Sequence, residues 1–186
     1  MRKMPSWSMT FIAATLAFGL SSGAHAATDL RVTLTQIAPS GSVGLSPLWL
    51  GFHNSSFDLF DAGSAASLGI ERISEDGNSA PLSALFSATT LTGKQTTLPG
   101  PPAFPGAVRT TTLTGLDLQG DNRYLSYAAM VVLSNDFFIG NDNAKEHDLS
   151  NLVAGGGHLT LFIGGGGQVW DAGTEVNDFA NSLANG

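Results

Sequence analysis

The chain has 186 residues, of which 12% are charged and 42% are hydrophobic, and its formal net charge at pH 7 is −7. This length suits one domain with a sizeable core. The acidic balance argues against nucleic acid and anionic membranes as partners, because both select clustered lysine and arginine side chains. The chain contains no cysteine, which excludes disulfides, cysteine nucleophiles, thiolate zinc sites and iron–sulfur clusters.

Residues 1–26 have the pattern of a secretory signal peptide. Two basic residues follow Met1, an apolar run occupies residues 9–20, and the small-x-small sequence Ala-His-Ala stands at 24–26. The apolar run is shorter than the roughly 20 residues that a membrane-spanning helix needs. We therefore expect cleavage near Ala26 and export to the extracellular space or the periplasm. The mature part, residues 27–186, would form a single domain without a transmembrane segment.

The rest of the chain is typical of an all-β protein. Residues 30–38 place Leu30, Val32 and Leu34 at every second position, which is the period of a strand with one buried face. The run at 123–134 is apolar enough to be a central strand covered on both sides. Gly, Pro, Ser, Asn and Asp clusters separate the runs, so we expect an antiparallel sandwich or barrel. Further strands are predicted at 47–54, 108–118, 157–164 and 169–170.

Two segments predict short helices in the loops. Residues 65–77 carry Leu68, Ile70 and Ile73 at helical spacing and end in Gly77, a residue typical of helix ends. The C-terminal residues 177–186 could begin a second helix.

Two carboxylates stand four residues apart in the segment WDAGTE, directly after the last predicted strand. Asp171 and Glu175 could bend around a hard cation such as Ca²⁺, which takes six to eight oxygen ligands. A further ligand would have to come from another loop, and residues 133–143 are rich in suitable oxygens. The alternative is that these Asn and Asp side chains close Asx turns. The candidates in this loop are Asn135, Asp136, Asn141, Asp142 and Asn143.

A near copy of this segment, LFDAGSA, occupies residues 59–65 but lacks the second acid. We interpret its Asp58 and Asp61 as turn residues. No G-x-S-x-G, H-E-x-x-H or Walker-type motif occurs in the chain. A hydrolase that pairs His53 with Asp58 or Asp61 remains an alternative hypothesis.

Five blocks, taken in order, resemble the spondin domain, the module near the N-terminus of F-spondin, and above all its stand-alone bacterial secreted members. The resemblance spans about residues 30–178. Its most specific part is the pairing of an S-x-D-[FW]-[FI]-x-G loop with a later W-D-A-G-T-[DE] segment. The blocks are RVTLTQIAP, PLWLGFHNSSFDLFDAGSAAS, GIERISEDGN, YLSYAAMVVLSNDFFIGN and WDAGTEVND.

The resemblance implies a β-sandwich related to C2 domains and a non-enzymatic module of the extracellular matrix and of adhesion. It also implies one structural Ca²⁺, whose ligands in this sequence would be Asp136, Asp171 and Glu175. Asn135 and Phe137 replace the Pro and Trp of the animal loop, and the animal disulfide cysteines are absent. Bacterial relatives usually continue past this C-terminus, so the edge of one sheet could be incomplete.

These observations predict a secreted, calcium-binding β-sandwich that interacts with an unidentified extracellular protein or glycan. The alternative within the same fold is a C2-like module that binds lipid or glycan through Ca²⁺.

Overall fold

The computed structural model describes residues 7–14, 26–152, 157–163 and 168–176. Its strands form two antiparallel sheets, with the orders β10–β1–β2–β6 and β11–β8–β7–β4–β5. The short strands β3 and β9 also pair with β7. In chain order the elements are β1 (Trp7–Ala14), β2 (Thr28–Thr35), β3 (Gly44–Leu45), β4 (Trp49–His53), α1 (Leu68–Asp76), α2 (Ala80–Thr89), β5 (Lys94–Thr97), β6 (Val108–Leu116), β7 (Tyr124–Val132), β8 (Phe137–Gly140), β9 (His147–Asp148), the 3₁₀ turn Ser150–Leu152, β10 (His158–Ile163) and β11 (Val169–Asp171).

Strand β2 has the alternation predicted from the sequence. Leu30, Val32 and Leu34 are buried, whereas the residues between them are at least partly exposed. Successive side chains of a strand point to opposite faces, so this period gives the first sheet one apolar face. Strand β2 pairs with β6 on one side and with β1 on the other. The predicted strand at 30–38 is thus confirmed, with its end at Thr35.

Strand β7 is the centre of the second sheet, between β4 and β8. Its residues from Leu125 to Ala129 are all buried. Leu125, Tyr127 and Ala129 pack toward the first sheet, and Ala128 packs on the opposite side. The prediction of a central strand covered on both faces is confirmed.

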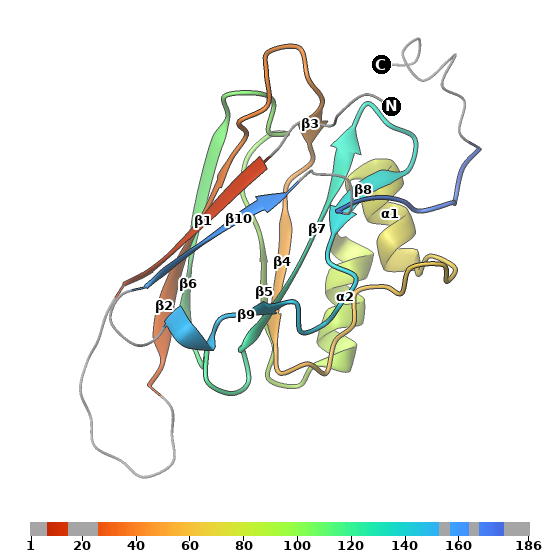
Figure 1. Cartoon of the computed structure of the whole chain (residues 1–186). Helices are drawn as coiled ribbons and strands as arrows, with labels where there is room; N and C mark the ends of the chain where they lie inside the picture. Colours follow the sequence, from red (N-terminus) through yellow and green to blue (C-terminus); the bar gives the residue numbers. More distant parts are fainter. Residues whose placement is uncertain (1–6, 15–25, 153–156, 164–167, 177–186) are drawn as a thin grey trace.

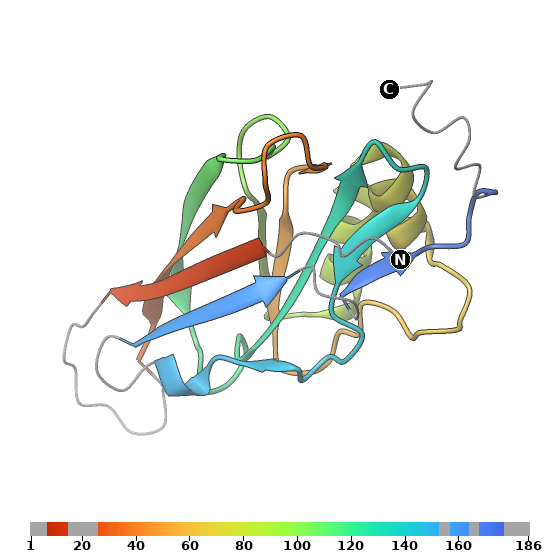
Figure 2. The same ribbon diagram turned by 45° about the horizontal axis from the view of Figure 1, so that its top comes forward.

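Two hydrophobic cores on the two faces of the second sheet give the molecule three layers (Figures 1 and 2). Between the sheets the core is mainly aliphatic. Between the second sheet and the helices it is rich in aromatic rings, including Trp49, Phe57, Phe86 and Phe138. The fold is an all-β antiparallel sandwich, as predicted, with two helices covering the outer face of one sheet.

Helix α1 is the helix predicted at 65–77. The hydroxyl of Ser67 accepts the N–H of Ile70 at 3.3 Å and caps the N-terminus. Gly77 ends the helix with φ = 64°, in the left-handed region that favours glycine. Ile70 and Ile73 bury the apolar face.

Helix α2 has no counterpart among the elements predicted from the sequence. Pro81 lies in the first turn of the helix, where its missing N–H is not needed. Leu82 and Phe86, four residues apart, are the buried residues of the helix. Gly69 of α1 allows the two helices to pack closely, since a Cβ at this position would lie 3.0 Å from the Cα of Leu82 in α2.

Besides the two-residue strands β3 and β9, two longer strands of the second sheet are also absent from the sequence-based expectation. Strand β8 lies within residues 133–143, which we expected to form one loop, and this expectation is wrong. Residues 137–140 instead form a hairpin with β7. Strand β5 is polar along its length and pairs with β4 at the edge of the sheet. The predicted strands at 47–54, 108–118, 157–164 and 169–170 are present as β4, β6, β10 and β11.

Strand β1 lies inside the segment predicted to be a signal peptide. It pairs with β2 on one side and with β10 on the other, and cleavage near Ala26 stays a prediction. The helix predicted at 177–186 and the C-terminal edge lie outside the described residues. Among the residues that are described, no helix is long and apolar enough to cross a membrane.

Candidate functional site

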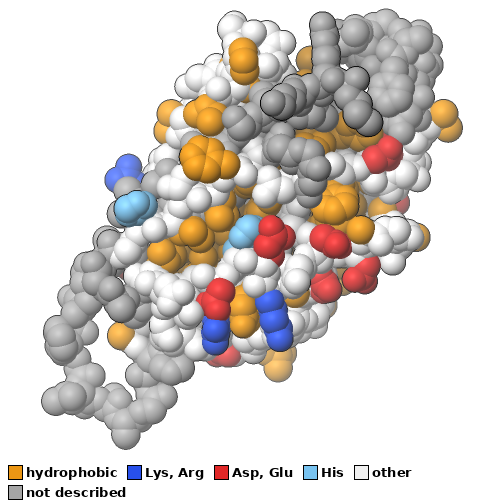
Figure 3. Space-filling view, viewed as in Figure 1, with side chains coloured by type: hydrophobic (Ala, Val, Ile, Leu, Met, Phe, Trp, Pro, Cys, Tyr) orange, Lys and Arg blue, Asp and Glu red, His pale blue; other side chains and the backbone are white. Residues whose placement is uncertain are grey.

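Acidic side chains gather in the half of the molecule that holds β8, β11 and the helices, with hydrophobic side chains exposed among them (Figure 3). The hairpin between β7 and β8 places Asp136 in this half. Leu133 has φ = 77°, and the hydroxyl of Ser134 donates to the carbonyl of Val131 at 2.6 Å. The same hydroxyl accepts the N–H of Phe137 at 3.1 Å. These bonds fix the turn, so that Asp136 stands directly before β8.

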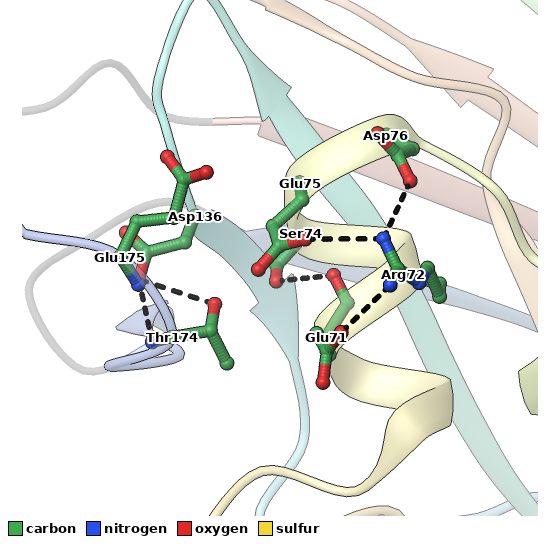
Figure 4. Close-up of polar contacts among 8 residues, drawn as sticks. All are labelled: Glu71, Arg72, Ser74, Glu75, Asp76, Asp136, Thr174 and Glu175. Carbon is green, nitrogen blue, oxygen red and sulfur yellow. Dashed lines mark hydrogen bonds and ion pairs between the residues drawn. The ribbon is translucent and has the colours of Figure 1, made fainter.

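Asp136 is fully buried and joins this hairpin to the loop after β11 (Figure 4). Its Oδ2 accepts the backbone N–H of Thr174 at 2.9 Å and that of Glu175 at 3.1 Å. Its backbone carbonyl accepts the N–H of Ala172 at 3.1 Å. The two segments that the sequence predicts to share a site are therefore in direct contact.

The second carboxylate oxygen of Asp136 is buried and has no hydrogen-bond partner among the described residues. Arg72 of the neighbouring helix α1 does not neutralise it, because its guanidinium contacts three acids of its own helix, Glu71, Glu75 and Asp76 (Figure 4). A buried polar oxygen without a partner is unfavourable, and a buried charge more so. Asp136 thus combines a carboxylate held in place by backbone N–H groups with one oxygen for which the described part of the chain supplies no donor.

Asp171 is the last residue of β11, and Glu175 lies on the loop after it that Asp136 holds. Strand β11 runs antiparallel to β8 and pairs Asp171 with Phe137. The Oδ1 of Asp171 accepts the N–H of Gly173 at 2.8 Å, and Gly173 has φ = 66°. Asp171 therefore closes an Asx turn, the alternative role considered from the sequence. The side chain of Glu175 is exposed.

The three predicted ligands thus lie on two adjoining segments, but their carboxylates do not converge on one point. Within the described parts of the chain, no three acidic, histidine or cysteine side chains are grouped closely enough to hold a metal. The donor set still fits Ca²⁺ in its chemistry. Asp136 offers a buried oxygen that has no partner among the described residues, and the segment attached to it carries the exposed carboxylates of Asp171 and Glu175, beside which water could complete the ligands.

Three other acceptors of the 133–143 stretch serve the fold. The Oδ1 of Asn141 accepts the N–H of Tyr127 at 3.0 Å inside the second sheet. The Oδ1 of Asp142 accepts the N–H of Ala62 at 2.8 Å and so anchors a distant loop. Asn143 closes an Asx turn with the N–H two residues on. The side-chain oxygens of these three residues therefore accept backbone N–H groups, which is the alternative to cation binding that the sequence left open.

His53 is buried in the aromatic core and not in a cleft. Its Nδ1 accepts the N–H of Ser55 at 3.1 Å, so Nε2 carries the proton and donates to the hydroxyl of Ser126 at 3.0 Å. Burial lowers the pKa of His53 to about 4. Both ring nitrogens are engaged, so neither is available to Asp58 or Asp61, the partners that the hydrolase hypothesis requires.

Comparison with known proteins bears directly on the resemblance described above. No curated protein matches the chain. A family model described as Spondin_N matches residues 38–178 of the 186, a stretch that contains Asp136, Asp171 and Glu175. Since the match covers well over half of the sequence, the chain belongs to the spondin N-terminal domain family, whose members are extracellular-type modules.

Proposed function

We propose that this protein is a secreted, non-enzymatic module that binds one Ca²⁺ and uses the stabilised end of its sandwich to contact an extracellular protein or glycan. The family supports a module of the extracellular type, and the leader pattern at 1–26 supports export. The acidic composition is compatible with binding a cation.

The observation that carries the calcium proposal is the buried Oδ1 of Asp136, for which the structure describes no hydrogen-bond partner within residues 7–14, 26–152, 157–163 and 168–176. Its neighbour Oδ2 already receives two backbone N–H groups, so the carboxylate cannot turn away without losing both bonds. A divalent cation at Oδ1 would neutralise the buried charge. Asp171 and Glu175 would then complete the ligand set with waters, after a change of side-chain conformation.

Such an ion would join the β7–β8 hairpin to the loop after β11. In the structure these segments are joined by the pairing of β8 with β11, by the hydrogen bonds to Asp136, and by that of the Asn135 amide to the carbonyl of Val176. A ligand that binds only the folded state stabilises it by an amount that grows with the logarithm of its concentration. At a Ca²⁺ concentration 100 times the dissociation constant, the gain is about 2.7 kcal/mol. For a chain of this size that corresponds to a rise in melting temperature of roughly 5–10 °C.

The test is thermal unfolding in EDTA and in millimolar Ca²⁺, together with calorimetric titration of Ca²⁺ into the metal-free protein. Asp136→Asn keeps an oxygen for the backbone N–H groups of Thr174 and Glu175 but removes the charge. We expect the wild type to melt several degrees higher in Ca²⁺, and we expect this increase to vanish in Asp136→Asn and to shrink in Glu175→Gln.

Asp29→Asn is a matched control, because the carboxylate of Asp29 also accepts a backbone N–H, that of Gly115 at 3.0 Å, but lies in the other sheet. This variant should respond to Ca²⁺ as the wild type does. The proposal fails if Ca²⁺ gives no binding heat and leaves the melting temperature of the wild type unchanged.

A further inference from the structure

Strand β6 is the longest edge strand in the described part of the chain. It has nine residues, whereas the other strands that end a sheet, β10, β5 and β11, have six, four and three. Strand β2 pairs with one side of β6, and no described strand pairs with its other side (Figures 1 and 2). A long open edge presents unpaired backbone N–H and C=O groups to any second strand.

The last residues of β6 are protected against such pairing. The register with β2 shifts between Thr28 and Leu30, which marks a bulge in β6 at Gly115, whose φ is 66°. The ammonium group of Lys94 donates to the carbonyls of Thr114 and Gly115, at 2.8 and 2.6 Å. Bulges and edge lysines are two of the features that keep strands of folded proteins from pairing with other chains.

The first six residues of β6, 108–113, have no such protection. They contain no proline and a single charged residue, Arg109. The guanidinium group of Arg109 donates to the backbone carbonyls of Pro101 and Val108 in its own chain. Three consecutive threonines follow, and β-branched side chains favour strand pairing. The edge is therefore open over this part of β6.

This side of the molecule lacks the acids that give the chain its negative charge. Residues 77–116 contain no aspartate or glutamate, and their charged residues are Lys94 and Arg109. Strands β8 and β11, in the acidic half of the molecule, lie on the opposite side of the sandwich from β6 (Figure 1). Two copies of an acidic protein repel each other. A second copy therefore meets less repulsion at β6 than at the acidic half.

Large hydrophobic side chains stand beside the start of β6. Ile37, Phe104 and Val108 have exposed fractions of 46%, 45% and 54%. The N–H of Gln36 donates to the carbonyl of Ala107, and the N–H of Ala107 donates to the carbonyl of Phe104, both at 2.9 Å. These hydrogen bonds hold the loops on either side of β6 together, so the apolar group is fixed at one end of the open edge.

A groove of about 330 Å³ lies beside the other end of β6. Residues 94–96 of β5 and residues 112–114 of β6 form its walls. Strand β5 ends the second sheet and β6 ends the first, so the groove opens where both sheets have an edge. An apolar group at one end of β6 and a groove at the other make this side complementary to a second copy of itself, placed in the reverse direction.

We propose that two copies of this chain pair through the open edges of β6 and form an antiparallel dimer with two-fold symmetry. In such a dimer each contact occurs twice, and the start of one β6 lies beside the end of the other. The apolar side chains of each copy then meet the groove of its partner. Backbone hydrogen bonds between the two copies of β6 join their first sheets into one continuous sheet.

The geometry of antiparallel pairing limits the register of this contact. Only alternate residues of an edge strand direct their N–H and C=O groups outward, so outward residues must face outward residues. One residue therefore lies directly opposite its own copy. If this residue is Thr111, Thr110 faces Thr112 and Arg109 faces Leu113, and no like charges are opposed.

The dimer should be weak. The open edge is short and the apolar group beside it is small, so the interface belongs to the class that buries less than about 1,200 Å² in total. We expect a dissociation constant of about 10–100 µM. The protein would then be monomeric in dilute solution and dimeric where its local concentration is high.

The test is sedimentation equilibrium of the exported protein in EDTA, over about 1 to 500 µM, a range that brackets the expected constant. We expect a reversible change from monomer to dimer. Thr110→Lys/Thr112→Lys puts two charges on the open edge and should weaken association at least ten-fold. Ala84→Lys/Ala88→Lys is the matched control, because it adds the same charge at exposed positions of α2. It should dimerise as the wild type does.

Single cysteines locate the two-fold axis, because the chain has no cysteine of its own. Thr110→Cys, Thr111→Cys and Thr112→Cys are compared in their rate of disulfide formation between copies. A disulfide requires Cβ atoms about 3.5–4.5 Å apart, so we expect one of the three to cross-link at least ten-fold faster than the others. Thr33→Cys, on the central strand β2, is the control and should not cross-link.

A protein that stays monomeric at the highest concentration would overturn the proposal, as would equal cross-linking of the three cysteine variants. Association that survives Thr110→Lys/Thr112→Lys but is lost in Phe162→Lys would assign the contact to β10 and overturn it as well. Because the experiment is run in EDTA, dimerisation upholds this proposal even if the protein binds no Ca²⁺.

Discussion

His53 and His147 are buried polar residues whose surroundings keep them uncharged. Both ring nitrogens of His53 are bonded to serine groups, and burial lowers its pKa to about 4. His147 lies with its ring centroid 5.6 Å from that of Tyr127, and burial again lowers its pKa to about 4. In the unfolded chain both histidines would titrate near 6.5, the ordinary pKa of a solvated histidine. Unfolding at mildly acidic pH therefore takes up protons.

This difference predicts how stability depends on pH. A lowered pKa in the folded state gives a stabilisation that is complete above pH 6.5 and is lost as the pH falls toward about 4. Between pH 7 and pH 5 the expected loss is roughly 2 kcal/mol for each histidine. Urea denaturation at several pH values in this window measures it directly.

His53→Gln should reduce the slope of stability against pH by about half, whatever its effect on stability at pH 7. His158→Gln is the control, because His158 is exposed on β10 and should leave the slope unchanged. A wild-type protein that is equally stable at pH 7 and pH 5 would contradict this account of the two buried rings.

At the scale of single elements, the end of helix α1 depends on Gly77. Its φ of 64° is strained for other residues, and a Cβ there would lie 2.8 Å from the Cβ of Ser46. Ser46 in turn accepts the N–H of Met130 at 2.9 Å, so a displacement would reach β7. We expect Gly77→Ala to lower the free energy of unfolding by about 2–4 kcal/mol, through strain of about 1 kcal/mol and overpacking of about 1–3 kcal/mol.

Gly41→Ala separates backbone strain from overpacking. Gly41 also has a positive φ, 83°, but a Cβ added to it would have no other atom within 4 Å. It should lower the free energy of unfolding by about 1 kcal/mol only. Denaturant titration of the two variants compares them under the same conditions. Equal losses in both would show that the contact with Ser46 relaxes without strain.

The two helices show why some elements are predictable from the sequence and others are not. Helix α1 has an apolar stripe, a serine cap and a glycine end, all of them local signals. Helix α2 has apolar residues on its exposed side as well, such as Leu85, so its faces do not differ in hydropathy. Strand β8 has four residues between polar turns, too few to show an alternation. Its place is set by pairing with β7, which is a tertiary effect.

At the scale of the whole molecule, the candidate site is predictable in its residue types but not in its arrangement. The acids of WDAGTE and of the β7–β8 loop could be named in advance, and the family match covers the residues that carry them. The burial of Asp136 depends on which loop folds over it. The segment LFDAGSA forms a turn, because the N–H of Ser64 donates to the carbonyl of Asp61 at 3.0 Å. Its place opposite Trp170 could not be foreseen, because it results from contacts between distant parts of the chain.

The predicted signal peptide has a consequence for the first sheet. Strand β1 belongs to the segment expected to be removed, yet it is the strand that joins β10 to β2. Strand β10 is antiparallel to β1, and β1 is antiparallel to β2, so β10 and β2 run parallel. Without β1 they would be separated by the width of one strand, and closing that gap would require movement of about 5 Å. The buried side chain of Ile163 at the end of β10 opposes such a movement.

We therefore expect the backbone amides of β10 to exchange with solvent at least ten-fold faster in a chain of residues 27–186 than in the full chain produced without export. Strand β2 keeps its partner β6 and should lose only part of its protection, while β7 in the second sheet should not change and serves as the internal control. Hydrogen exchange followed by mass spectrometry measures all three, and sedimentation shows whether the open edges lead to self-association. Equal protection of β10 in both chains would refute the expectation, because β10 would then have to pair directly with β2 in the exported protein and β1 would be dispensable to the sandwich.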